Sequence, residues 1–200
     1  MSQPSIILSN MYALDIETDT SGGNGLDPQI ARITTIAFYN PVDAVVFENN
    51  NEKQLLLDTI TWLKARPSSQ IVTWNGSAFD GPYMYARSKI LGIESPFTNF
   101  TLNSDSPKYK PLSGFTGCYD FSFASNDGEH TSIDIAYKYK AICESKAMSW
   151  SLKAVAKSFG IGVIEVDREN MHKLTVAERL AYNFSDVVAT YMLASNFKNL

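Results

Sequence analysis

Residues 13–18 read ALDIET, a short apolar run that carries two acids. Such a run indicates a β-strand, and side chains two residues apart on a strand point to the same face. Asp15 and Glu17 are therefore expected to lie together on one face. An Asp-x-Glu triplet arises about once by chance in a chain of this size, so the triplet alone favours a solvated strand end.

A third acid, Asp80, lies between an expected strand at residues 71–74 and an expected helix that begins near Pro82. Asp is a preferred helix N-cap and Pro is favoured in the first helical turn, so a capping role explains Asp80 without any chemistry. An acid in this position can also leave one carboxylate oxygen facing a cleft at the sheet edge. The two interpretations are compatible, and the sequence leaves both open.

The last helix is the best marked in the chain. Thr175 and Glu178 have the spacing of a capping box, which places the helix start at Thr175. Tyr182 and Asp186 lie four residues apart in this helix and so share one face. Asp186 lies beside an apolar stripe, where acids are uncommon unless they are paired or bound to a metal ion. An ordinary surface position for Asp186 is the alternative.

The order of the expected elements indicates an α/β fold. The expected strands are residues 11–17, 32–39, 44–48, 71–74 and 132–137, and the expected helices are residues 52–64, 82–91, 151–159 and 175 onward. An antiparallel start followed by alternating strands and helices fits a ribonuclease H-like mixed sheet flanked by helices. The order also permits other α/β folds.

Residues 93–130 differ from the rest of the chain. They contain three prolines, three glycines and many small polar residues, which predicts a long irregular insertion with a β-hairpin near residues 117–124. Residues 1–200 as a whole are expected to form a single domain, because 200 residues are typical of one.

Composition excludes several classes of protein. Hydrophobic residues make up 44% and charged residues 19% of the chain, which is typical of a globular domain rather than a disordered one. The net charge of −4 argues against binding nucleic acid through a general positive coat. Cys118 and Cys143 have neither zinc-site spacing nor a disulfide framework. With no run of about 20 apolar residues and no signal-peptide pattern, a cytoplasmic location without membrane contact is expected.

Taken together, three motifs resemble a known family. ALDIET at residues 13–18, WNGSAFD at residues 74–80 and the pair Tyr182 and Asp186 resemble, in order, the three exonuclease motifs of the DEDD superfamily. The resemblance is nearest to the proofreading 3′–5′ exonuclease domains of family B DNA polymerases. It extends over nearly the whole chain, and three ordered motifs are far more specific than any one of them.

Two further features refine the resemblance. The histidine branch of the superfamily has His five residues before the last acid, where this chain has Ala181, whereas the tyrosine branch has the tyrosine found at Tyr182. The chain therefore resembles a DEDDy enzyme. Asp134 with its apolar neighbours and the run SWSLKAV at residues 149–155 also resemble the stretch that these domains carry before the third motif.

The resemblance implies a metal-dependent 3′–5′ exonuclease that hydrolyses single-stranded or frayed DNA and releases nucleoside 5′-monophosphates. Its cofactors would be two divalent cations, Mg²⁺ or Mn²⁺, for which a few carboxylates suffice as ligands. Asp15 would bridge the two ions, Glu17 and Asp186 would complete the site of the nucleophile-side ion, and Asp80 would hold the other ion through water. Tyr182 would orient the attacking water, because a phenol with an ordinary pKa of about 10 is a poor base at neutral pH.

Contacts to the nucleic-acid strand are expected from five residues. Asn75 could donate its amide to the terminal nucleotide, and Phe79 could stack on a base, although Phe79 is as consistent with a core position. Trp150 and Lys153 belong to a lysine-rich stretch with interleaved aromatic residues that could follow the strand. Asp134 is either a helper of the site or a strand-end residue.

The lysine-rich stretch runs from residue 135 to residue 160. It has five lysines against one acid: Lys138, Lys140, Lys146, Lys153 and Lys157 against Glu144. This local positive charge in an acidic chain predicts a surface that binds the DNA strand. A solvated lysine-rich helix face is the competing interpretation.

Three other functions compete with the DNA exonuclease. A 3′–5′ exoribonuclease would keep the fold and the chemistry and take RNA as its substrate. A catalytically silent nucleic-acid-binding accessory module is disfavoured because all four acids and Tyr182 are intact. A phosphatase of the Asp-x-Asp type is disfavoured because residue 17 is Glu. No polymerase domain follows the third motif, so the domain is expected to work alone or with a separate polymerase or another replication or repair partner.

Overall fold

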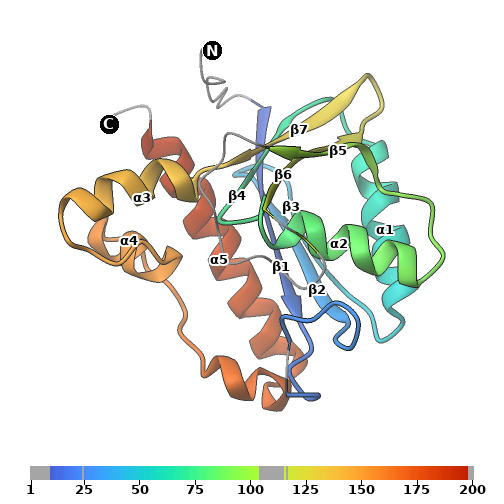
Figure 1. Cartoon of the computed structure of the whole chain (residues 1–200), viewed down its shortest axis with the longest axis horizontal. Helices are drawn as coiled ribbons and strands as arrows, with labels where there is room; N and C mark the ends of the chain where they lie inside the picture. Colours follow the sequence, from blue (N-terminus) through green and yellow to red (C-terminus); the bar gives the residue numbers. More distant parts are fainter. Residues whose placement is uncertain (1–9, 24, 104–114, 116, 198–200) are drawn as a thin grey trace.

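The computed structural model describes residues 10–23, 25–103, 115 and 117–197. The strands are β1 (Met11–Thr18), β2 (Ile33–Tyr39), β3 (Ala44–Glu48), β4 (Gln70–Thr73), β5 (Phe97–Asn103), β6 (Cys118–Ala124) and β7 (Glu129–Asp134). The α-helices are α1 (Glu52–Lys64), α2 (Asp80–Ile90), α3 (Ala136–Ser145), α4 (Leu152–Ser158) and α5 (Val176–Asn196), with a 3₁₀ segment η2 (Arg168–Lys173). Figure 1 shows the helices covering both faces of a central sheet.

The strands form one mixed seven-stranded sheet in the order β3-β2-β1-β4-β7-β6-β5. The three central strands β1, β4 and β7 are parallel, whereas β2 and β3 on one side and β6 and β5 on the other pair antiparallel. The predicted α/β class with an antiparallel start is confirmed. The arrangement is that expected of a ribonuclease H-like sheet.

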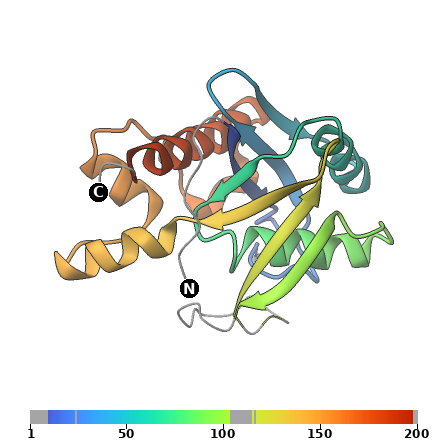
Figure 2. The same cartoon turned by 90° about the horizontal axis from the view of Figure 1, so that it is seen from above.

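The sheet separates two hydrophobic cores, because side chains alternate between its faces. Leu14 and Ile16 of β1 pack in the core under α1 and α2. Met11 and Ala13 pack in the opposite core, under α3, α4 and α5. Figure 2 shows the two groups of helices on opposite sides of the sheet. Asp15 and Glu17 continue the Met11–Ala13 face, so this alternation turns both acids towards α5.

The helix starts follow local sequence. Thr175 caps α5, and both bonds of the predicted capping box with Glu178 are formed. Asn51 caps α1 and Ser151 caps α4, each by accepting a hydrogen bond from a backbone N–H three residues on. No helix of the described residues is both long and apolar enough to cross a membrane.

The prediction of an irregular segment over residues 93–130 is wrong for residues 97–103, which form a strand, whereas the β-structure expected near residues 117–124 is present as β6. Residues Phe97–Asn103 and Cys118–Ala124 form β5 and β6, which pair antiparallel, and β6 continues the sheet to β7. None of the three prolines and three glycines falls within these two strands. Phe97, Phe121 and Phe123 pack into the core shared with α2. Residues 104–114 and 116 lie outside the described residues. Helix α3 was not predicted, because residues 132–137 were interpreted as a strand.

Candidate active site

Three acids from two distant elements meet at the carboxyl end of β1. Asp15 and Glu17 lie on one face of β1, and Asp186 lies on α5, which packs across β1 and β2. One carboxylate oxygen from each acid lies within 4.8 Å of the others. The predicted pairing of Asp15 with Glu17 on one strand face is confirmed. Clustered carboxylate oxygens of this kind suit a hard divalent cation such as Mg²⁺.

Asp80 approaches the same place from the other face of the sheet. It is the first residue of α2, and its Oδ1 accepts a 3.0 Å hydrogen bond from the backbone N–H of Ile16, between the two acids of β1. The N-cap of α2 is Phe79, so the capping role considered for Asp80 is wrong. Burial, and then the neighbouring charge of Asp15, raise the pKa of Asp80 well above its usual range. A cation placed between these acids would oppose that shift.

The four acids line one pocket of about 790 Å³. Its apolar walls come from residues that span the whole chain: Leu26, Trp74, Phe79, Trp150, Leu152 and Met171. Three of the predicted strand contacts, Asn75, Phe79 and Trp150, are among the lining residues. Part of the Phe79 ring packs on Tyr83 at 5.2 Å between centroids, so Phe79 has a core contact as well as a pocket face.

Tyr182 lies one turn before Asp186, and both side chains are nearly fully buried. Lys153 of α4 reaches the same spot: its Nζ forms an ion pair with the Asp186 carboxylate and lies 4.4 Å from the centre of the Tyr182 ring. Lys153 is therefore a neighbour of the acid cluster itself rather than a contact on an outer surface. Its positive charge partly balances the negative charge of the four acids.

Asn183 was missed by the sequence reasoning. It is fully buried on α5, and its Nδ2 donates a 2.6 Å hydrogen bond to Oδ2 of Asp15. This bond fixes the orientation of the Asp15 carboxylate. The available signal was its spacing, because Asn183 lies three residues before Asp186 and four before the buried Val187, on the core stripe of the helix.

Asp134 holds the loop between β4 and α2. Its carboxylate accepts hydrogen bonds from the backbone N–H groups of Asn75 (2.9 Å), Ser77 (3.1 Å) and Ala136 (3.0 Å), and from Ser77 Oγ (2.7 Å). Burial raises the pKa of Asp134 above its usual range. Asp134 is not among the described residues that line the pocket. The geometry therefore favours a role in holding the loop over direct contact with a nucleic-acid strand.

The same loop presents Asn75 with an unusual backbone. Its φ of +65° lies in the left-handed region, which Asn adopts more readily than most residues. The buried Oδ1 of Asn75 has no hydrogen-bond partner within the described residues. A buried acceptor that lines the pocket in this way is suited to a donor group of a ligand.

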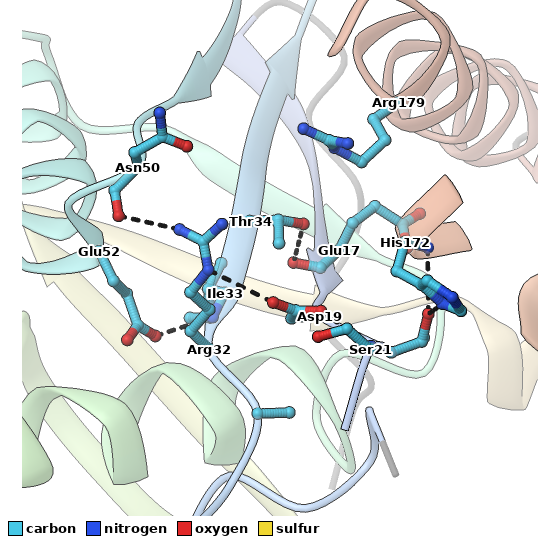
Figure 3. A network of polar contacts seen from close by, with 12 residues as sticks. Glu17, Asp19, Ser21, Arg32, Ile33, Thr34, Asn50, Glu52, His172 and Arg179 are labelled. Atoms are coloured by element: carbon cyan, nitrogen blue, oxygen red, sulfur yellow. Dashed lines mark hydrogen bonds and ion pairs between the residues drawn. The ribbon is translucent and has the colours of Figure 1, made fainter. Parts of the chain in front are cut away.

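The end of β1 carries an irregularity beside the acids. The pairing with β2 shifts between Glu17 and Thr18, so that Thr34 is left out of the register. Thr34 Oγ1 donates a 3.1 Å hydrogen bond to the Glu17 carbonyl, and Figure 3 shows the two residues side by side. The bulge therefore leaves the backbone of Glu17 anchored to β2.

Other members of the lysine-rich stretch make contacts within the chain. Lys140 pairs with Glu144 at 3.6 Å and lies 5.4 Å from the ring centre of Trp150. Lys157 pairs with Glu165 at 2.6 Å, with both side chains more than half exposed. Binding of a nucleic-acid strand by this stretch stays a prediction.

Comparison with solved structures supports the fold. The family B DNA polymerase of the hyperthermophilic archaeon Pyrobaculum calidifontis is similar in structure with a TM-score of 0.63 and 19% sequence identity. The match covers 98% of this chain and 24% of the polymerase chain, so this chain spans about a quarter of its length. No curated protein matches the sequence.

Comparison with protein families covers more than half of the chain. Residues 38–155 match the family described as DNA polymerase family B, exonuclease domain. The match includes Asp80 and Asp134, while Asp15 and Asp186 lie outside it and join Asp80 only in the folded structure. The chain therefore belongs to the family of exonuclease domains of family B DNA polymerases.

Proposed function

We propose that residues 1–200 form a single metal-dependent 3′–5′ exonuclease domain. It hydrolyses phosphodiester bonds from the 3′ end of single-stranded or frayed DNA and releases nucleoside 5′-monophosphates. The observation that carries the proposal is the approach of the Asp15, Glu17 and Asp186 carboxylate oxygens to within 4.8 Å of one another at the wall of a large pocket. Family membership independently supports a nuclease.

The residues present fit two divalent cations. All the candidate ligands are carboxylate oxygens, which Mg²⁺ and Mn²⁺ prefer, and burial together with the charge of Asp15 raises the pKa of Asp80, a shift that a bound cation would oppose. Asp15, Glu17 and Asp186 would hold one ion, and Asp15 with Asp80 would hold the other. When bound, the ions supply electrostatic stabilisation of the negative charge on the attacking and leaving oxygens.

The remaining groups of the site orient the attacking water and the carboxylate ligands. The Tyr182 hydroxyl hydrogen-bonds to the attacking water and aims it at the phosphorus atom. Asn183 holds Asp15 in one rotamer through the 2.6 Å bond, and a fixed ligand loses little entropy when the ion binds. The Lys153 ammonium pairs with Asp186 and therefore competes with an ion for that carboxylate.

The pocket walls select a single strand. Asn75 offers polar amide atoms to the terminal nucleotide, and Phe79 and Trp150 offer ring faces on which bases stack. We expect a duplex end to fray before its last nucleotide reaches the acids, because a base that stacks on Phe79 or Trp150 is not stacked in a duplex.

The direct test uses a 5′-labelled single-stranded DNA oligonucleotide with Mg²⁺, with Mn²⁺ and with chelator. A ladder that shortens from the 3′ end in either metal and is absent with chelator is the expected result. Asp15→Asn should abolish cleavage, whereas Asp58→Asn on α1, which does not line the pocket, should not. A matched RNA oligonucleotide decides the alternative substrate. Absence of metal-dependent cleavage of both the DNA and the RNA oligonucleotide would refute the nuclease function.

A further inference from the structure

The interface between α5 and the sheet contains buried polar atoms that have no hydrogen-bond partner within the described residues. Thr35 Oγ1, Arg179 Nε and Asn183 Oδ1 are among them. Thr35 and Asn183 are fully buried. An unpaired buried polar atom costs free energy, and such atoms in folded proteins nearly always have a partner. These atoms therefore indicate a ligand that supplies the hydrogen bonds.

Thr35 forms the sheet side of this group. It pairs with Glu17 of β1 on one side and with Glu48 of β3 on the other, and residues paired across strands point to the same face of a sheet. Glu17 shares its strand face with Ala13, which packs in the core under α5. The Thr35 hydroxyl therefore points towards α5 from a strand between two acids.

Arg179 and Asn183 form the helix side. They lie four residues apart on α5 and so share one face. Arg179 Nη2 lies 3.7 Å from Glu48 Oε1 of β3, whereas Asn183 Nδ2 bonds to Asp15 of β1. The helix thus crosses from β3 to β1 within this turn, and β2 is the strand between them. Thr35 faces the helix from β2, so it lies beneath the turn that carries both side chains.

The Arg179 side chain is held in a way that leaves its Nε for another partner. Its Nη1 donates to the Leu174 carbonyl at 2.7 Å, and its Nη2 faces Glu48. The side chain is 17% exposed, and Figure 3 shows it extending from α5 towards the sheet. The Nε–H group is consequently a fixed donor within the interface.

The hydrogen-bonding character of these atoms identifies the ligand. Arg179 Nε is only a donor, Asn183 Oδ1 is only an acceptor, and the Thr35 hydroxyl is both. A metal ion would be repelled by the guanidinium, and an anion would be repelled by the amide oxygen and the nearby acids. A water molecule accepts from the guanidinium and donates to the amide oxygen, and a buried water typically makes about three hydrogen bonds. The set of donors and acceptors therefore fits one water.

We propose that a water molecule is bound between α5 and β2 by Arg179 Nε, Thr35 Oγ1 and Asn183 Oδ1, and that it holds Asn183 in the orientation that bonds to Asp15. The water contacts the oxygen of the Asn183 amide, so it does not compete for the Nδ2 bond to Asp15. Arg179 and Thr35 are thus positioning residues behind a candidate metal ligand. The water site is independent of the proposed function, whereas its effect on a bound cation rests on that function.

The water site is tested by a high-resolution crystal structure and by Thr35→Val. The crystal structure should show an ordered water within about 3 Å of all three atoms. Thr35→Val removes the hydroxyl and keeps the shape of the side chain, and it should lower Tm by about 2–4 °C because the water loses a partner. A hydroxyl without a partner would make the same substitution neutral or stabilising. A Tm equal to or above wild type, or no water at the three atoms, would overturn the water site.

The positioning role is tested by the binding of Mn²⁺ in the absence of DNA, with EPR of the free ion as the measurement. Thr35→Val and Arg179→Lys keep the charge of the site, so neither alters its attraction for a cation directly. Each should raise the Kd of Mn²⁺ about three- to tenfold, whereas Thr35→Ser, which keeps the hydroxyl, should stay within about twofold.

Arg66→Lys is the matched control for Arg179→Lys. Arg66 pairs with Asp43 at 2.6 Å and does not line the acid pocket, so its substitution should leave the Kd of Mn²⁺ unchanged. A Kd equal to wild type in either Thr35→Val or Arg179→Lys would overturn the positioning role.

The path through Asn183 is tested by a double-mutant cycle. In an Asn183→Ala background the water has no amide to orient, so the addition of Thr35→Val should change the Kd of Mn²⁺ by less than about twofold. The same fold increase in both backgrounds would show that Thr35 acts independently of Asn183 and would overturn this path.

The outcomes separate this inference from the proposed function. A wild-type chain that binds no Mn²⁺ contradicts the metal-dependent nuclease, while the crystal structure and the Tm of Thr35→Val still decide the water site. A chain that cleaves DNA but holds no water at the three atoms overturns the inference alone. If Arg179→Lys does not fold, the comparison of Thr35→Val with Thr35→Ser still decides the positioning role.

Discussion

Asn183 Nδ2 lies 2.6 Å from Asp15 Oδ2, although the two residues are 168 positions apart in the chain. The bond joins the middle of α5 to the end of β1 at the point where the acids converge. Because Asn183 is fully buried, its amide has no water with which to exchange this bond. The orientation of the candidate bridging ligand therefore depends on a residue outside the three motifs.

Asn183→Ala should lower activity about 10- to 100-fold at subsaturating Mg²⁺, since the carboxylate it orients becomes free to rotate. Excess Mg²⁺ should restore part of the loss. The measurement is the initial rate of cleavage against Mg²⁺ concentration. Asn196→Ala, near the end of the same helix, is the control. A Mg²⁺ dependence identical to wild type would contradict a role for Asn183 in orienting Asp15.

Lys153→Met should reduce the Mg²⁺ concentration needed for half-maximal activity. The Lys153 ammonium pairs with Asp186, so it competes with a divalent cation for the same carboxylate. Titration of the cleavage rate with Mg²⁺ measures the shift. Lys157→Met is the matched control, because Lys157 lies on the same helix and pairs with the exposed Glu165. A higher Mg²⁺ requirement in Lys153→Met would show that the lysine assists the site rather than competing with the ion.

Asp134→Asn should loosen the loop that carries Asn75. An amide group cannot accept all the hydrogen bonds that the carboxylate receives from Asn75, Ser77 and Ala136, and it places a donor against one of these N–H groups. We expect a loss of about 1–3 kcal/mol in the free energy of unfolding and a raised KM for the strand. Urea denaturation and steady-state kinetics measure the two effects.

Asp127→Asn is the control for Asp134→Asn, because Asp127 also accepts backbone and hydroxyl bonds but is exposed. Its substitution should change stability by less and leave KM unaltered. If Asp134→Asn keeps wild-type KM while losing stability, the carboxylate supports the fold alone and does not position Asn75.

His130 should make stability depend on pH. The ring is fully buried, with Nε2 3.0 Å from the Leu63 carbonyl and Nδ1 2.5 Å from Ser69 Oγ, an arrangement that a neutral ring satisfies by donating from Nε2 and accepting at Nδ1. Burial lowers the pKa of His130 below its ordinary 6.5. Between these two pKa values the unfolded chain binds a proton that the folded chain does not.

The free energy of unfolding should therefore be fully retained above pH 6.5, fall as the pH drops below 6.5 and level off below the folded-state pKa. His130→Gln should remove this part of the pH dependence, whereas substitution of the exposed His172 by Gln should not. Urea denaturation between about pH 4 and pH 8 makes the comparison. The difference in free energy of unfolding between wild type and His130→Gln should be smaller at pH 5 than at pH 7.5. The same difference at both pH values would contradict a buried neutral ring.

The features that local sequence predicts well are those that arise within a few residues. The period of two along β1 places Asp15 and Glu17 on one face, and the capping box sets the start of α5 at Thr175. Both follow from backbone geometry over no more than one helical turn or one strand repeat. The motif resemblance then identified the exonuclease family, although the roles of the individual site residues stay predictions.

The features that were missed or wrong depend on partners far away in the chain. Strand β5 was interpreted as irregular because its pairing with β6 and the packing of Phe97 on α2 are absent from its own sequence. The sequence leaves a capping role open for Asp80, because nothing local reveals that the backbone N–H of Ile16 is its hydrogen-bond donor.

The convergence of the acids has the same origin. Only the packing of α5 across β1 brings Asp186 and Asn183 to Asp15. In the same way, only the packing of α2 against residues 25–32 brings Tyr83 and Arg87 to the wall of the pocket. Local sequence specifies which face of an element a side chain occupies, because that depends on bond geometry alone. The distance between side chains on two different elements depends on how those elements pack. That packing is determined by the burial of both hydrophobic cores as a whole.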